Sequence, residues 1–169
     1  MTIEMQQPRP FDLVTDQIQI AGQALTFEAN IQWRVDLGTV NAAGFFTGGG
    51  GVSVLQFQET LDVGGLGIHP YPGPAHLTLF SESPADGSID DATSVQVILA
   101  ERLFSDYEGW QPYTIQPGDT LSALAADRYG DASAFGHIHA ANPHIIANPN
   151  QIFVGMQIRL PLGTPIPPN

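Results

Sequence analysis

The sequence predicts two domains, an all-β antiparallel sandwich followed by a small α+β domain with a βααβ layout. Three observations predict this division. Short runs of alternating apolar residues, separated by turn residues, recur through residues 1–103. Residues 112–161 have the pattern of a strand, two short helices and a second strand. The acidic charge is concentrated in residues 1–110. Residues 104–111 are predicted to link the domains.

The clearest strand prediction of the first domain covers residues 24–36, where apolar and polar side chains alternate. Its apolar side would carry Phe27, Ala29, Ile31, Trp33 and Val35. Further strand-like runs cover residues 11–14, 17–21, 40–47, 52–63, 75–81 and 94–103, with glycine-rich or polar turns between them. About seven strands in roughly one hundred residues predict an antiparallel sandwich.

The first half of the second domain is predicted to be a strand followed by a helix. Tyr113 and Ile115 alternate with polar neighbours, and Pro117-Gly118 supplies a turn. Either Asp119 or Thr120 is suited to cap a helix. That helix would bury one apolar stripe and end at a glycine, and these positions are Leu121, Leu124, Ala125 and Gly130.

A second short helix and a final strand complete the predicted domain. Asp131 or Ser133 would cap this helix, with Phe135 and Ile138 on its apolar side. The Asn142-Pro143 pair would end it, because proline cannot continue a helix. Residues 157–160 would form the last strand, and the proline-rich residues 162–169 are predicted to be a loose tail.

These features resemble the LysM family over residues 112–161, because the turn, the Gly118-Asp-Thr-Leu helix start, the Asn-Pro stop and the final Gly155-to-Pro161 strand occur in order. The resemblance implies a shallow groove for N-acetylglucosamine units of peptidoglycan or chitin. One implied wall is Gly118, Asp119, Thr120, Leu121 and Ser122. The other is Asn142, Pro143, His144, Ile145 and Ile146. Capping and core packing alone would also explain many of these residues.

Two positions depart from the common LysM pattern. Met156 stands where glutamine is usual, and Phe135 stands where tryptophan or tyrosine is frequent. Neither is expected in the groove. In addition, Tyr129-Gly-Asp131 and the long loop 142–150 resemble the LysM variety of cytoplasmic bacterial proteins and of phage-tail-like baseplates, where the domain docks onto protein. The sequence therefore leaves glycan binding and protein docking open.

The first domain resembles an immunoglobulin-like domain of bacterial sporulation and spore-germination proteins. The resemblance rests on Gly22-Gln-Ala24, Phe27-Glu-Ala-Asn30, Phe57, Phe80-Ser-Glu-Ser83 and Asp86-Gly-Ser88. It implies a spacer or adhesion module without a catalytic centre.

Charge argues against several classes of partner. The chain carries seventeen acidic residues against five arginines, a formal net charge of -12 over 169 residues. Residues 1–110 hold fourteen acids and three arginines, a net of -11, whereas residues 111–169 hold three acids and two arginines, a net of -1. Such a surface repels nucleic acid and anionic lipid, so neither is an expected partner.

No apolar stretch long enough to span a membrane and no signal-peptide pattern is seen in the sequence. We therefore expect a protein located in the cytoplasm or in an assembly, or at the cell wall if another route exports it. The chain also lacks cysteine, which excludes disulfides and thiolate chemistry.

No catalytic centre is predicted. His137 and His139 are two residues apart, which does not match the i, i+4 pair of helical zinc sites. Ser122 lacks a recognisable base. We therefore predict a non-enzyme without cofactor or metal. Its partner would be peptidoglycan or another N-acetylglucosamine polymer, or alternatively protein in a multiprotein assembly.

Overall fold

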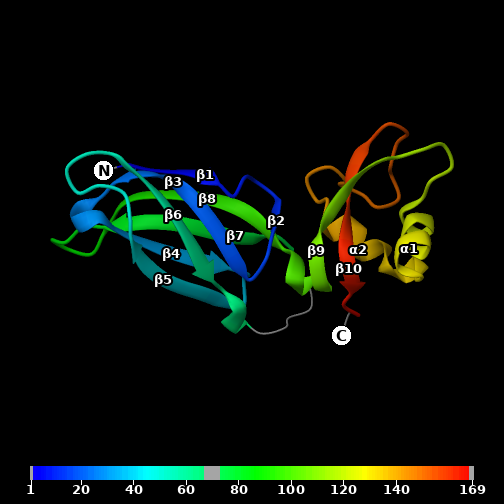
Figure 1. Cartoon of the computed structure of the whole chain (residues 1–169), viewed down its shortest axis with the longest axis horizontal. Helices are drawn as coiled ribbons and strands as arrows, with labels where there is room; N and C mark the ends of the chain where they lie inside the picture. Colours follow the sequence, from blue (N-terminus) through cyan, green and yellow to red (C-terminus); the bar gives the residue numbers. More distant parts are fainter. Residues whose placement is uncertain (1, 67–72, 168–169) are drawn as a thin grey trace. The chain divides into compact units, whose positions relative to one another are not determined.

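The computed structural model describes residues 2–66 and 73–167, which are mostly β with few helices (Figure 1). Two compact units emerge, one formed by residues 2–66 with 74–98 and the other chiefly by residues 99–167. Part of the predicted loop 64–74, residues 67–72, lies outside the described residues. No described helix has the length and apolar character needed to cross a membrane.

The first unit contains two sheets. The smaller has the order β1-β3-β6. The larger has the order β2-β8-β7-β4-β5. Strands β3 and β6 pair antiparallel, as do β4 and β5, β4 and β7, and β7 and β8. The strands are β1 (Thr2–Gln7), β2 (Asp12–Val14), β3 (Gln17–Leu25), β4 (Asn30–Asp36), β5 (Asn41–Thr47), β6 (Leu55–Asp62), β7 (Ala75–Glu82) and β8 (Ile89–Leu99).

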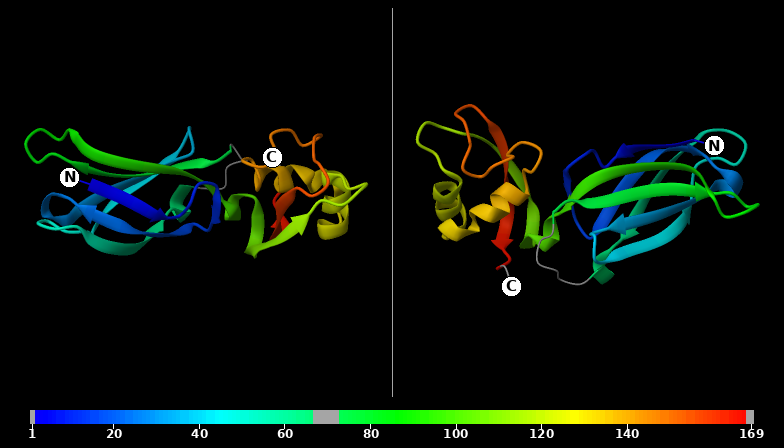
Figure 2. Two further views of the ribbon diagram at one scale, coloured as in Figure 1. Left: turned by 90° about the horizontal axis from the view of Figure 1, so that it is seen from above. Right: turned by 180° about the vertical axis from the view of Figure 1, so that it is seen from behind.

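Alternation along these strands creates the core of the first unit. Every second side chain of β3, β4 and β7 is buried, as expected for strands with one wetted face. The sheets meet through the rings of Phe46 on β5 and Phe57 on β6, whose centroids are 5.4 Å apart. The fully buried side chains of this core include Ile18, Ile20, Ile31, Leu77 and Leu79. Figure 2 shows the two layers from further directions.

The predicted single strand 24–36 is two strands in different sheets. Strand β3 ends at Leu25, and β4 begins at Asn30 after the short 3-10 turn η1 (Phe27–Ala29). Glu28 and Ala29 have φ values of 53° and 54°, which no strand allows. Phe27 is 45% exposed and does not join the core as predicted. The buried positions change from even-numbered residues on β3 to odd-numbered residues on β4, because the turn between the two strands shifts the alternation by one residue.

The second unit consists of β9 (Phe104–Thr114), α1 (Leu121–Tyr129), the 3-10 turn η4 (Ala132–Ala134), α2 (Phe135–Ala140) and β10 (Gln157–Pro165). Strands β9 and β10 pair antiparallel. The helices bury their apolar stripes against these strands. The shared core includes Ile115, Leu121, Leu124, Ala125, Ile138, Ile146, Ile158 and Leu160.

Residues 104–111 differ from the predicted linker because they form most of β9. Strand β10 continues beside them, with Pro161 opposite Trp110 and Pro165 opposite Phe104. Phe104 is fully buried, and its ring centroid lies 5.6 Å from that of Tyr129. The Tyr129 hydroxyl donates to the Pro161 carbonyl at 3.0 Å.

Residues 162–165, predicted as part of a loose tail, belong to β10. Beyond the strand, the Ile166 amide donates to the Leu103 carbonyl at 2.9 Å. A pairing partner thus orders a proline-rich segment that has no strand propensity of its own.

Candidate binding pocket

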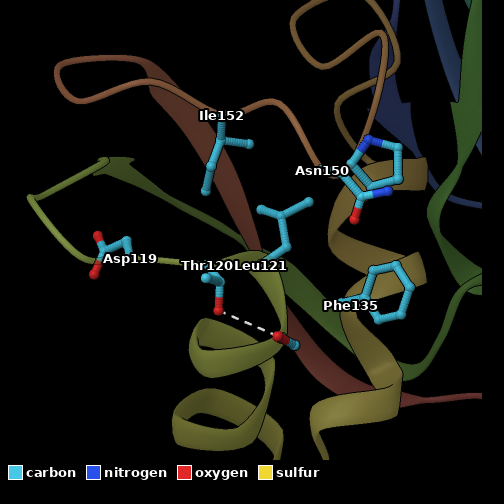
Figure 3. A pocket seen from close by; sticks show the side chains of 8 residues that line it. Asp119, Thr120, Leu121, Phe135, Asn150 and Ile152 are labelled. Atoms are coloured by element: carbon cyan, nitrogen blue, oxygen red, sulfur yellow. Dashed lines mark hydrogen bonds between the residues drawn. The ribbon is translucent and has the colours of Figure 1, made fainter.

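The first wall of the candidate site is the start of α1. Gly118 has a φ of 91°, so the Pro117-Gly118 turn requires a residue that tolerates the left-handed region. Thr120 caps the helix, its hydroxyl oxygen accepting from the Ala123 amide at 3.1 Å. The Thr120 and Ser122 hydroxyls lie 3.1 Å apart at the mouth of the site (Figure 3). The sequence left Asp119 and Thr120 open as caps, and the structure assigns the cap to Thr120.

Asp119 instead holds the preceding turn together. Its Oδ2 atom accepts from the Gln116 amide at 2.7 Å and from the Tyr113 hydroxyl at 2.9 Å. The hydrogen bond to this carboxylate raises the pKa of Tyr113, because it stabilises the protonated phenol. The other oxygen, Oδ1, accepts no hydrogen bond from the described residues, so it is available to a ligand hydroxyl or amide.

The opposite wall comes from the loop before β10. Within this loop, Asn148 orders the backbone, since its side-chain oxygen accepts from the Asn150 amide at 3.0 Å and its carbonyl accepts from the Gln151 amide at 2.9 Å. Further along, the Gly155 amide donates to the Ile115 carbonyl at 2.9 Å, which ties the loop to the core. The loop therefore presents its side chains on an ordered backbone.

Between these walls lies an open pocket of about 320 Å³, near the lower end of the range for small-molecule sites. Its lining is half apolar and half polar in character. Leu121 is almost fully buried at its base, and Figure 3 shows Ile152 directed toward Leu121 with Phe135 at one side. The lining residues are Asp119, Thr120, Leu121, Ser122, Phe135, Pro149, Asn150 and Ile152.

Four residues of the first predicted wall, Asp119 to Ser122, line this pocket. Gly118 shapes the turn that leads to it but does not line it.

The second predicted wall, residues 142–146, lies outside this pocket. Asn142 is completely buried and Ile146 is 1% exposed in the core, while Ile145 packs partly against that core. Pro143 is partly buried and His144 is exposed, yet neither lines the pocket. The chain turns inward after α2, and the facing wall therefore forms several residues later, at Pro149 to Ile152.

Sequence reasoning missed four lining residues, Phe135, Pro149, Asn150 and Ile152. Phe135 was expected outside the groove, but it is 38% exposed and lines the pocket at the first position of α2. The position of Phe135 could have been predicted from the sequence. A side chain at the start of a helix points back over the preceding turn, and an aromatic ring there is directed away from the core.

Two of the histidines considered for zinc are bound to backbone carbonyls. The His137 Nε2 atom lies 2.7 Å from the Ile166 oxygen, and the His139 Nε2 atom lies 3.0 Å from the Ile146 oxygen. Among residues 2–66 and 73–167, no three His, Cys, Asp or Glu side chains are grouped as a metal site would require.

Comparison with known families identifies both units. A family model for an immunoglobulin-like domain of bacterial spore germination, Gmad2, matches residues 2–88. A LysM domain model matches residues 113–161. Both predicted resemblances, and their order, are confirmed. No solved structure matches the chain.

Similar curated proteins match only part of the chain. A potassium binding protein, Kbp, of Escherichia coli is 39% identical over 51 residues, which are 30% of this chain and 34% of that protein. Two esterases of Mycobacterium tuberculosis are 51% identical over 51 residues, 30% of this chain and 11% of each esterase. The chain thus matches about a third or less of the length of each relative.

Proposed function

The chain belongs to the family with the immunoglobulin-like domain of bacterial spore germination, here joined to a LysM domain, and on this premise we propose a non-catalytic bacterial binding protein. Its LysM pocket recognises glycan that contains N-acetylglucosamine, with peptidoglycan as the natural polymer. The acidic first unit spaces or presents this module. The site of action is the cell wall, or an assembly that contacts it.

The observation that carries the proposal is the mixed lining of the pocket. Leu121, Ile152 and Phe135 supply apolar surface for the acetamido methyl group and a sugar face, and Asp119 and Asn150 supply polar groups at the rim. N-acetylglucosamine needs both kinds of contact at once. The pocket is open rather than enclosed, so it suits one or two units of a chain that continues beyond it at both ends.

An open pocket of this size implies weak binding to short oligomers. Because the contact area is small, little net binding free energy remains once the ligand has lost its translational and rotational freedom. Useful attachment to a wall therefore requires several copies acting together. The near-neutral charge of residues 111–169, a net of -1, permits approach to an anionic wall polymer that the first unit would repel.

The test is a pull-down of the full chain on purified peptidoglycan and chitin, followed by titration with chitooligosaccharides. Two isoleucines provide a matched pair. Ile152 lines the pocket, whereas Ile145 is similarly half-buried but lies on the sequence-predicted wall. We expect Ile152→Ala to weaken binding about tenfold and Ile145→Ala to leave it nearly unchanged.

The two variants can be compared if both unfold within a few degrees of the same temperature, because a difference in binding then does not reflect unfolding. Weakening by Ile145→Ala alone would place the ligand at residues 142–146 rather than in the pocket. Failure of the unsubstituted chain to bind either polymer would refute the glycan proposal. Phe135→Ala serves as a second pocket variant and is expected to weaken binding as Ile152→Ala does.

An alternative function is that of a structural subunit whose LysM domain docks onto protein in a multiprotein assembly. The observation favouring it is a pair of exposed apolar residues next to the pocket wall, Phe153 at 66% and Val154 at 64% exposure. The two side chains form a small exposed apolar patch, and phenylalanine is enriched in protein interfaces relative to the rest of the surface.

Substitution of both residues by serine separates the two functions. If the chain docks onto protein, the double variant should leave glycan retention unchanged and abolish co-isolation with native partners. If instead it lowers glycan retention as much as Ile152→Ala does, Phe153 and Val154 belong to the glycan site and the assembly proposal loses its support. Both assays are run in sodium and in potassium salts. A difference between the two salts would show that potassium, which the E. coli relative is named for binding, affects this chain.

A further inference from the structure

Among the strands that the structure describes, β5 lies at one end of the five-stranded sheet and pairs with β4 alone (Figure 1). An end strand leaves half of its backbone amides and carbonyls without a partner in the sheet. The β4–β5 register identifies those groups. The Leu37 amide donates to the Val40 carbonyl at 2.9 Å at one end of the pair, and the Gly48 amide donates to the Ala29 carbonyl at 2.8 Å at the other.

Because hydrogen-bonded residues alternate along an antiparallel pair, these two bonds set the pattern between them. The even-numbered residues, such as Gly44, bond to β4, and the odd-numbered residues direct their amides and carbonyls away from it. The residues with outward backbone groups are Asn41, Ala43, Phe45 and Thr47. All four are exposed, and no backbone hydrogen bond from the described residues reaches them. The 3-10 turn η2 (Gly64–Leu66) lies beside β5 without bonding to it.

The other strand edges of this unit carry features that discourage pairing, and β5 carries none of them. Strand β2 has three residues. Strand β1 has a register irregularity after Met5, and β6 contains Glu59 and Asp62. In contrast, β5 has seven uncharged residues, no proline and no bulge, and its Phe45 is 72% exposed. Natural sheets rarely leave such an edge open.

We propose that β5 is a self-association edge, at which two copies of this chain join their five-stranded sheets through antiparallel β5–β5 pairing. A two-fold axis at Gly44 sets Ala43 of one copy opposite Phe45 of the other, and Asn41 opposite Thr47. All four residues with outward backbone groups then meet each other. The pairing is isologous, and each large Phe45 ring covers a small Ala43 rather than a second ring.

Charge favours a second copy of β5, rather than another edge strand of this chain, as the strand that pairs with β5. Residues 1–110 carry a net charge of -11, and the β1 and β6 edges contain carboxylates. Pairing β5 with itself brings no charge into the strand contact. The whole-molecule repulsion remains, so association strengthens when salt screens it.

The test is sedimentation or light scattering of the full chain over a wide concentration range, at low and at high salt. Ala43→Pro removes an outward amide and no β4 bond, so the fold should tolerate it. Phe45→Lys places a charge on the edge. We expect a dimer that tightens with salt, and at least about tenfold weaker association in either variant.

Ser94→Lys is the control, because Ser94 is also exposed on this sheet but lies on the inner strand β8. It should dimerise like the unsubstituted chain, and unfolding curves establish that all variants are folded. A chain that stays monomeric at every concentration and salt would overturn the proposal. So would Ala43→Pro and Phe45→Lys variants that associate as strongly as the unsubstituted chain. Glycan retention is measured on the same samples, so loss of dimerisation is distinguished from loss of pocket function.

Discussion

Replacing Asn142 tests most sharply how the second unit is held together. Its side chain is fully buried and makes three hydrogen bonds. The Nδ2 group donates to the Ile138 carbonyl at 2.7 Å and to the Arg159 carbonyl at 2.8 Å, and Oδ1 accepts from the Arg159 amide at 2.7 Å. One amide group thus satisfies both backbone groups of a β10 residue and ties that strand to the end of α2.

The cost of Asn142→Ala is estimated from these bonds. Each contributes about 1 kcal/mol, and the buried groups left unpaired add to the loss, so about 3–4 kcal/mol is expected. A unit of this size holds on the order of 5–7 kcal/mol in total. Asn142→Asp should cost more at neutral pH, because a carboxylate donates no hydrogen bond and two carbonyl oxygens would face it.

Urea unfolding followed by the helical circular dichroism signal measures this loss, since α1 and α2 lie in the second unit. Asn150→Ala, an exposed asparagine, is the control and should change stability by less than about 0.5 kcal/mol. A cost below about 1 kcal/mol for Asn142→Ala, or an Asp variant more stable than the Ala variant at neutral pH, would refute this reasoning.

Three further predictions concern a cap, a buried phenol and a close backbone approach. Thr120→Ala should lower the stability of the second unit by about 1 kcal/mol in urea unfolding, while Ser122→Ala, which keeps the cap, should not. Burial raises the pKa of Tyr129 from 10.0 to about 12, so its contribution to stability is complete below pH 10 and is lost as the pH rises toward 12. The free energy of unfolding should therefore fall less steeply with pH between 10 and 12 in Tyr129→Phe than in the unsubstituted chain. The same slope in both proteins would contradict the burial argument. Gly22→Ala should destabilise the first unit by about 1–3 kcal/mol in thermal or urea unfolding, because the added methyl group would press on the Glu4 carbonyl and the Phe57 ring. Gly65→Ala meets nothing nearby and is the control, so equal losses would argue against the steric cause.

Local patterns predicted the second unit well where a residue's role depends on its neighbours in sequence. Gly130 closes α1 in the left-handed conformation, as its position predicts, and Asp131 caps the following turn through the Ser133 amide. The pocket wall at Pro149 to Ile152 was not predictable in this way. That wall depends on the path of the chain after α2, where Asn142 is buried and bonded to residues of α2 and β10 that are distant from the wall in sequence.

The first unit shows the same limit. Alternation located most strands but not the crossing between sheets at Phe27–Ala29, because alternation reports burial and not the identity of the sheet. Strand β1 was not predicted either, since Ile3 is the only residue buried along it. The pairing of residues 104–111 with residues 160–165 joins segments far apart in the sequence, which neither segment signals alone.

The most direct test of the central claim is a titration of the isotope-labelled chain with an N-acetylglucosamine oligomer, followed by amide chemical shifts. Binding in the pocket predicts the largest shift changes at residues 119–122, at Phe135 and at residues 150–152. No change, or changes confined to residues 142–146, would contradict the assignment of the pocket as the glycan site.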